Sequence, residues 1–114
     1  METLNARIEE KLAEAEIRKD HKGYKYLMAV IKELYNKPDK FDGYKINDIY
    51  SKIATENNTE ATKVSDAIRY VIDGIIRWGK QISNKDFVEG IVSELEIDDL
   101  FAQQELKKLR EGKW

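Results

Sequence analysis

The chain has 114 residues, 41% hydrophobic and 37% charged, with a formal net charge of −2, so it fits one globular domain and is too short for two ordinary ones. The absence of cysteine excludes disulfides, thiolate catalysis and cysteine zinc sites, and the lone His21 has no second histidine for a metal site. The chain has no apolar run long enough for a signal peptide or a membrane span, so we expect a cytoplasmic protein. We also expect that it is not an enzyme and that it uses no metal or cofactor.

The first predicted element is a helix over residues 2–20. Its apolar residues fall on one narrow stripe, and the other positions are charged and rich in helix formers. A narrow stripe can dock on a domain or pair with another copy of itself. We therefore treat residues 1–20 as an N-terminal amphipathic helical extension. The stripe consists of Leu4, Ile8, Leu12 and Ala15.

A second helix follows the segment His21-Lys22-Gly23, which is expected to break the first one. The stretch "YKYLMAVIKELYN" places Leu27, Val30, Ile31 and Leu34 at helical spacing. Pro38 cannot continue a helix, so a polar loop is predicted over residues 37–45.

The centre of the chain predicts two helices joined by a tight turn. A short helix over 47–56 can be capped by Asn47. Asn57-Asn58-Thr59 follows, and asparagine tolerates the left-handed backbone that such a turn requires. A longer helix over 60–77 then has a buried stripe that includes Val64, Ile68 and Ile72. A short helix, a turn and a longer helix form the helix-turn-helix arrangement, which by itself also occurs in domains that do not bind DNA.

The C-terminal part predicts two further helices. "SNKD" at 83–86 is a capping-box pattern that opens a helix over 84–95. A last amphipathic helix, over about 98–110, carries Leu100, Phe101, Leu106 and Leu109. The expected fold is a compact all-α domain of about six helices, divided into the extension 1–20, a helix-turn-helix domain 21–97 and a C-terminal helix 98–114.

Charge is distributed unevenly along the chain. Residues 21–85 carry twelve basic and eight acidic side chains, whereas residues 1–20 carry four and six and residues 86–114 carry four and eight. A basic middle segment is typical of a surface that faces phosphates, although clustered solvated lysines give the same pattern.

Several motifs add a more specific signal. "GYKYL" at 23–27, "IYSKIATENNTEATKVSDAIRYVID" at 49–73, "RWGK" at 77–80 and "ISNKDFVEGIVSEL" at 82–95 occur in a familiar order. Together they resemble the C-terminal effector domain of the sporulation initiation response regulator, stage zero sporulation protein A, over about residues 23–95. That resemblance implies a six-helix DNA-binding domain whose recognition helix enters the major groove. Only about twenty residues precede "GYKYL", so we expect no receiver domain here and do not carry over control by phosphorylation.

The resemblance also implies positions for DNA contacts on helix 60–77. Thr62 replaces a family serine and Lys63 a family arginine, and Arg69 keeps a family arginine. Ser65 stands for a glutamate, Tyr70 for a histidine, and Asp66 reverses the charge of an arginine. The expected base-facing residues are therefore Thr62, Ser65, Asp66, Arg69 and Tyr70. The expected phosphate contacts are Lys45, Lys52, Lys63, Arg77 and Lys80.

Two functions remain open at this point. The first is a small stand-alone transcriptional regulator that reads double-stranded DNA with helix 60–77. The second is a protein-interaction module or antagonist that keeps the fold but has lost or altered DNA reading, because Asp66 repels phosphates. In either case a homodimer through residues 2–16 or 98–110 is an expectation.

Overall fold

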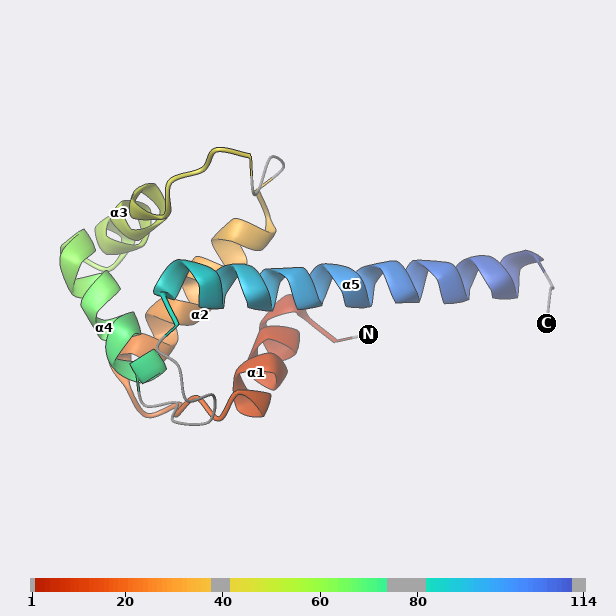
Figure 1. The fold of residues 1–114 in the computed structure, drawn as a ribbon, viewed down its shortest axis with the longest axis horizontal. Coiled ribbons are helices and arrows are strands. Elements are labelled where there is room, and N and C mark those ends of the chain that lie inside the picture. The colour runs from red at the N-terminus through yellow and green to blue at the C-terminus, as the bar shows by residue number, and fades with distance from the viewer. Residues whose placement is uncertain (1, 38–41, 74–81, 112–114) are drawn as a thin grey trace.

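The computed structural model describes residues 2–37, 42–73 and 82–111, and in these ranges it contains five helices and no strand (Figure 1). The all-α prediction is confirmed, while the count of six helices is wrong by one. The helices are α1 (Leu4–Glu14), α2 (Lys22–Tyr35), α3 (Ile46–Glu56), α4 (Ala61–Asp73) and α5 (Asn84–Glu111). Among the described residues, no helix is long and apolar enough to cross a membrane.

The miscount arises from α5, which continues through the expected break between 95 and 98. The residues at that junction are Glu96, Ile97 and Asp98, and none of them is a glycine or proline that would stop a helix. Seven residues of α5 are spaced alternately by four and three positions and therefore lie along one side of the helix. We call this set the core seam. They are Val88, Val92, Leu95, Asp99, Ala102, Leu106 and Leu109. The first three are buried, and the last three are exposed because α5 runs on past the body of the molecule (Figure 1).

Helix α2 lies at the centre of the fold and contacts α1, α3, α4 and α5. Its inward side chains Leu27, Val30, Ile31 and Leu34 are fully buried. The apolar spacing that predicted this helix therefore corresponds to the middle of the core.

Helix α1 is shorter than the predicted span 2–20 because it ends at Glu14. Glu16 adopts a left-handed φ of 63°, and the backbone N–H of Ile17 donates to the carbonyl of Leu12 at 3.0 Å. This Schellman-type ending turns Ile17 back into the core beside Leu12. Because Ile8 and Leu12 are fully buried, the stripe of α1 packs inside this molecule.

The segment His21-Lys22-Gly23 was expected to separate the first two helices, but only His21 lies outside them, because α2 begins at Lys22 and includes Gly23. A Cβ at this position would lie 2.1 Å from the carbonyl oxygen of Ala67 in α4. The glycine is needed because the backbones of α2 and α4 approach closely there.

Polar side chains tie α5 to other parts of the body. Arg7 of α1 forms an ion pair with Asp99 at 2.7 Å, and the Tyr35 hydroxyl of α2 donates to the same carboxylate. Tyr44, just before α3, donates its hydroxyl hydrogen to Glu89 at 2.6 Å. These contacts fix the half of α5 that lies against the body.

Candidate nucleic-acid interface

The connection between α3 and α4 has the tight geometry of a helix-turn-helix. Asn58 has a φ of 54°, and the N–H of Thr59 donates to the carbonyl of Ala54 at 3.0 Å. The side chain of Asn57 caps the helix end by donating to the carbonyl of Ile53 at 2.8 Å. The predicted left-handed asparagine is confirmed. The predicted Asn47 cap is wrong, since α3 begins at Ile46 and Lys45 occupies the cap position without a side-chain hydrogen bond.

Helix α4 is amphipathic, with one side in the core and one side in solvent. Its buried side chains, which face the neighbouring helices, are Val64, Ile68, Val71 and Ile72. Opposite to them runs a stripe at steps of four, three and four residues, which we call the outer stripe of α4. It consists of Thr62, Asp66, Arg69 and Asp73. Two of its four members are acidic, so the centre of this surface does not form a continuous basic ridge.

Arg69 is held by an acid of its own helix. Its Nη2 lies 2.7 Å and its Nε 2.9 Å from Oδ1 of Asp73, one turn further along α4. The Arg69 side chain is 28% exposed and that of Asp73 is 44% exposed. Exposed ion pairs of this kind contribute only about 0.3–0.5 kcal/mol to stability, so a DNA phosphate or base can compete for this arginine.

Ser65 lies at the edge of the body. It is half-buried, and its carbonyl accepts a hydrogen bond from the Asn84 side chain of α5 at 3.1 Å. Burial raises the pKa of the neighbouring Tyr50 hydroxyl, and hydrogen bonds from Asn84 and Ser65 partly oppose that increase. Ser65 therefore takes part in a polar junction between α3, α4 and α5.

The remaining residues of the predicted interface face solvent. Thr62, Lys63 and Asp66 are exposed, and Tyr70 is 67% exposed. The Tyr70 ring meets the edge of His21, with centroids 5.2 Å apart and planes at 79°. This contact aligns Tyr70 along the N-terminal end of α2.

The predicted phosphate contacts are placed unevenly. Lys45 and Lys63 are exposed beside α3 and on α4. Lys52 is exposed as well, but its Nζ lies 2.6 Å from Glu33, and the hydrogen bond to that carboxylate raises the pKa of Lys52. Arg77 and Lys80 lie outside the described residues. Within the described ranges, no three His, Cys, Asp or Glu side chains gather in a way that could hold a metal ion.

Two features of this surface were missed at the sequence level. The Arg69–Asp73 pair was visible as an i, i+4 spacing of opposite charges, a signal that favours such a contact on any helix. The Asn84–Ser65 bond joins residues 19 positions apart and had no sequence signal, because it depends on how α5 crosses α4.

Comparison with known proteins adds one finding. A family model described as sporulation initiation factor Spo0A C terminal matches residues 8–97. The matched segment contains all of α2, α3 and α4, most of α1 and the first half of α5. The comparison with curated proteins gives no match.

Proposed function

Since the chain belongs to the Spo0A C-terminal family, a family of regulatory DNA-binding effector domains, we propose that it binds double-stranded DNA itself by inserting α4 into the major groove. The observation that carries this proposal is the tight α3–α4 turn inside the matched segment, which leaves the outer stripe of α4 open to solvent. In this arrangement the chain acts as a small transcriptional regulator.

The exposed residues of α4 divide into base readers and phosphate contacts. Arg69 is the best-suited base reader, because a guanidinium fits the two acceptors of guanine. Thr62 and Tyr70 flank it, and Asp66 can accept a hydrogen bond from the amino group of cytosine. Lys63 and Lys45 hold the sugar–phosphate backbone on either side, which fixes the register of α4 in the groove.

Arg69 has to change partner when DNA binds. Its present partner Asp73 is half-exposed, and the ion pair is weak enough to be replaced by a stronger bidentate contact. Asp66 and Asp73 also repel the phosphates, so sequence-independent binding is weak and discrimination rests on the base contacts.

The experiment is a fluorescence-polarisation titration of short DNA duplexes at several salt concentrations. If about five phosphates are contacted, log K falls against log salt with a slope of roughly −4 to −5. Absence of binding to every duplex at the lowest salt contradicts the proposal.

A second candidate function is a protein-interaction module or antagonist of a related regulator. The specific observation in its favour is the pair of exposed acids, Asp66 and Asp73, on the outer stripe of α4. In that case the chain removes a related effector domain from its duplex while showing no affinity for the duplex alone. A gel-shift competition with such a domain separates the two functions.

A further inference from the structure

One side of α5 carries a second regular pattern that the DNA-binding proposal leaves unused. Six further residues of α5 are also spaced alternately by four and three positions. We call this set the outer heptad face. They are Gly90, Glu94, Ile97, Phe101, Gln104 and Lys108. This face differs from the core seam, because a helix turns by about 100° per residue and the two sets therefore lie on roughly opposite sides of α5. A 4–3 repeat over almost three heptads is the spacing by which one helix packs along another.

The middle of the outer heptad face is apolar and exposed. Ile97 is 51% exposed and Phe101 63%, and the adjoining Leu100 is 58% exposed. Residues 97–101 lie near the middle of α5, and the second half of this helix runs past the body of the molecule (Figure 1). Three large apolar side chains within five positions form a contiguous patch, which is a mark of an interaction site.

Charge along α5 favours a particular partner and direction. Residues 86–94 contain three acidic side chains and no basic one, whereas residues 105–110 contain three basic side chains and one acidic one. A second α5 that runs antiparallel brings the acidic segment of one copy beside the basic segment of the other. A parallel arrangement brings like charges together, which is unfavourable.

We propose that two copies of this chain pair through their outer heptad faces, with the two α5 helices antiparallel around a two-fold axis close to residue 99. In this register Ile97 packs on the partner's Phe101, and Phe101 on the partner's Ile97, as an isologous interface requires. Gly90 lies under the partner's Lys108. Residues 87–111 of the two helices then run side by side for roughly 36 Å at 1.5 Å per residue.

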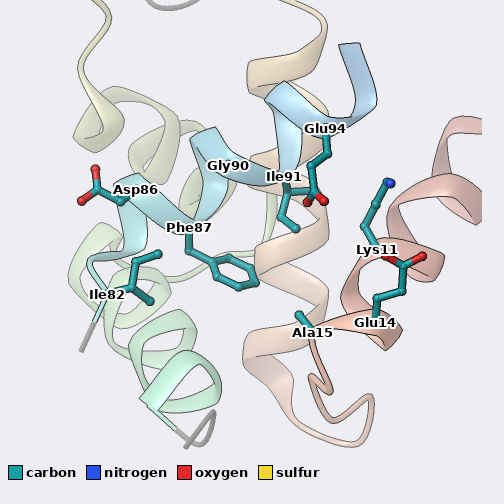
Figure 2. Close-up of a pocket in the computed structure, with 9 residues that line it drawn as sticks. All are labelled: Lys11, Glu14, Ala15, Ile82, Asp86, Phe87, Gly90, Ile91 and Glu94. Carbon is teal, nitrogen blue, oxygen red and sulfur yellow. The ribbon is translucent and has the colours of Figure 1, made fainter. Parts of the chain in front are cut away.

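Each copy has a groove in its body, and in this register the two grooves lie at the two ends of the interface, where each faces a side chain of the partner helix. The groove has a volume of about 450 Å³ and lies between α1 and α5, with Ala15, Phe87 and Ile91 as apolar lining (Figure 2). Gly90 lines it as well, and nothing lies within 4 Å of the place where a Cβ would be. Helical packing places a side chain of the partner into the hole formed by residues i, i+3, i+4 and i+7, here Phe87, Gly90, Ile91 and Glu94.

The partner's Lys108 suits this hole, because its side chain combines an apolar stem with a positive charge. Its methylene stem covers Phe87 and Ile91, and its ammonium group reaches the carboxylates of Glu94 and Asp86, both of which line the groove. The interface therefore has an apolar centre at Ile97 and Phe101 and an opposite-charge contact at each end.

The pairing is tested by sedimentation equilibrium of the full chain from low to high micromolar concentration. We expect a monomer–dimer equilibrium, and Phe101→Asp raises the dimer dissociation constant by about 30-fold or more because the residue occurs twice at the centre of the interface. Leu106→Asp is the matched control. Leu106 is 56% exposed on the same part of α5, but it belongs to the core seam, so its substitution leaves the dissociation constant within about two-fold.

A charge exchange tests the register independently of the apolar centre. Glu94→Lys and Lys108→Glu each raise the dissociation constant by about 3- to 10-fold, since every dimer contains the pair twice. The double variant Glu94→Lys with Lys108→Glu recovers most of this loss, although Asp86 at the same site stays acidic. Far-ultraviolet circular dichroism checks that each variant keeps its helix content.

Three outcomes overturn the proposal. The first is a chain that stays monomeric at all concentrations. The second is a dimer that Leu106→Asp dissociates as strongly as Phe101→Asp, which indicates pairing through the core seam. The third is a double charge variant whose loss of dimerisation free energy equals the sum of the losses of the two single variants, which rejects the antiparallel register.

Discussion

Arg69 and Asp73 form an ion pair one turn apart on the exposed side of α4, with Nη2 and Oδ1 separated by 2.7 Å. The pair joins the side chain best suited to read guanine to an acid that repels DNA. If Arg69 contacts DNA as proposed, the free energy of binding that it contributes is reduced by the loss of its ion pair with Asp73. In the proposed complex with DNA the pair makes α4 selective, because a weak phosphate contact does not replace Asp73 as well as a bidentate base contact does.

Asp73→Asn removes the charge that holds Arg69. We expect DNA affinity to rise by about 3- to 10-fold at low salt, because one repulsive charge disappears and the arginine is released. Polarisation titrations of the variant and the wild type measure this change. Glu105→Gln, which alters the same charge on the distant half of α5, serves as the control and leaves affinity unchanged. Equal or weaker binding by Asp73→Asn argues against a DNA-facing Arg69.

Lys63→Glu tests the phosphate contacts next to the groove. The substitution weakens binding of all duplexes by a similar factor and makes the slope of log K against log salt shallower by about 1. Lys25→Glu is the matched control, because Lys25 is exposed on the side of α2 opposite to Gly23, which touches α4. If the two variants lose the same affinity, the effect reflects net charge and not the position of Lys63.

Gly23→Ala tests the close approach of α2 and α4. The added Cβ would lie 2.1 Å from the carbonyl oxygen of Ala67, so the backbones have to separate. We expect the free energy of unfolding to fall by about 2–3 kcal/mol, measured by urea denaturation. DNA affinity falls as well, because α4 is displaced relative to α3.

Gly90→Ala is the control for that experiment. Gly90 lies within α5, and nothing lies within 4 Å of the added methyl group. Alanine has the higher helix propensity, so at protein concentrations low enough for a monomer the unfolding free energy rises by up to about 1 kcal/mol. A loss of stability equal to that of Gly23→Ala contradicts the argument from close approach.

Tyr44 predicts how stability responds to alkaline pH. Its pKa is raised in the folded state, first by burial and then by the hydrogen bond to Glu89. A folded pKa above the ordinary value of about 10 means that the folded protein keeps a proton that the unfolded chain loses. The stabilising contribution is therefore complete below about pH 10 and declines as the pH rises toward the folded pKa.

Tyr44→Phe removes this linkage. We expect a loss of about 1–2 kcal/mol at pH 7 from the missing hydrogen bond, and a shallower decline of stability above pH 10. Urea denaturation between pH 7 and 11 measures both effects. Tyr70→Phe, with its ring 67% exposed, keeps the wild-type stability at pH 7. Parallel curves for Tyr44→Phe and the wild type above pH 10 reject the linkage.

Most of the fold could be predicted from local patterns. The apolar spacing of Leu27, Val30, Ile31 and Leu34 marks a buried helix whatever surrounds it, and the asparagines at 57 and 58 mark the turn. The single error in helix number came from treating Asp98 as the start of a helix. An acid pair is equally compatible with a helix interior when another helix supplies a partner, as Arg7 does for Asp99.

The candidate site was less predictable because it depends on contacts between helices. The motif order placed Thr62, Asp66 and Arg69 on one helix face, but it did not show that Ser65 packs against Asn84 or that Lys52 pairs with Glu33. Such contacts are set by how helices cross, and sequence spacing within one helix carries no information about that.

Contact between α4 and DNA is tested most directly by amide chemical-shift mapping of the full chain during titration with a duplex that it binds. We expect the largest shifts between Thr62 and Tyr70, with smaller ones around Lys45 and almost none along residues 100–110. Shifts confined to α5, or none in α4 at saturating duplex, would contradict this contact.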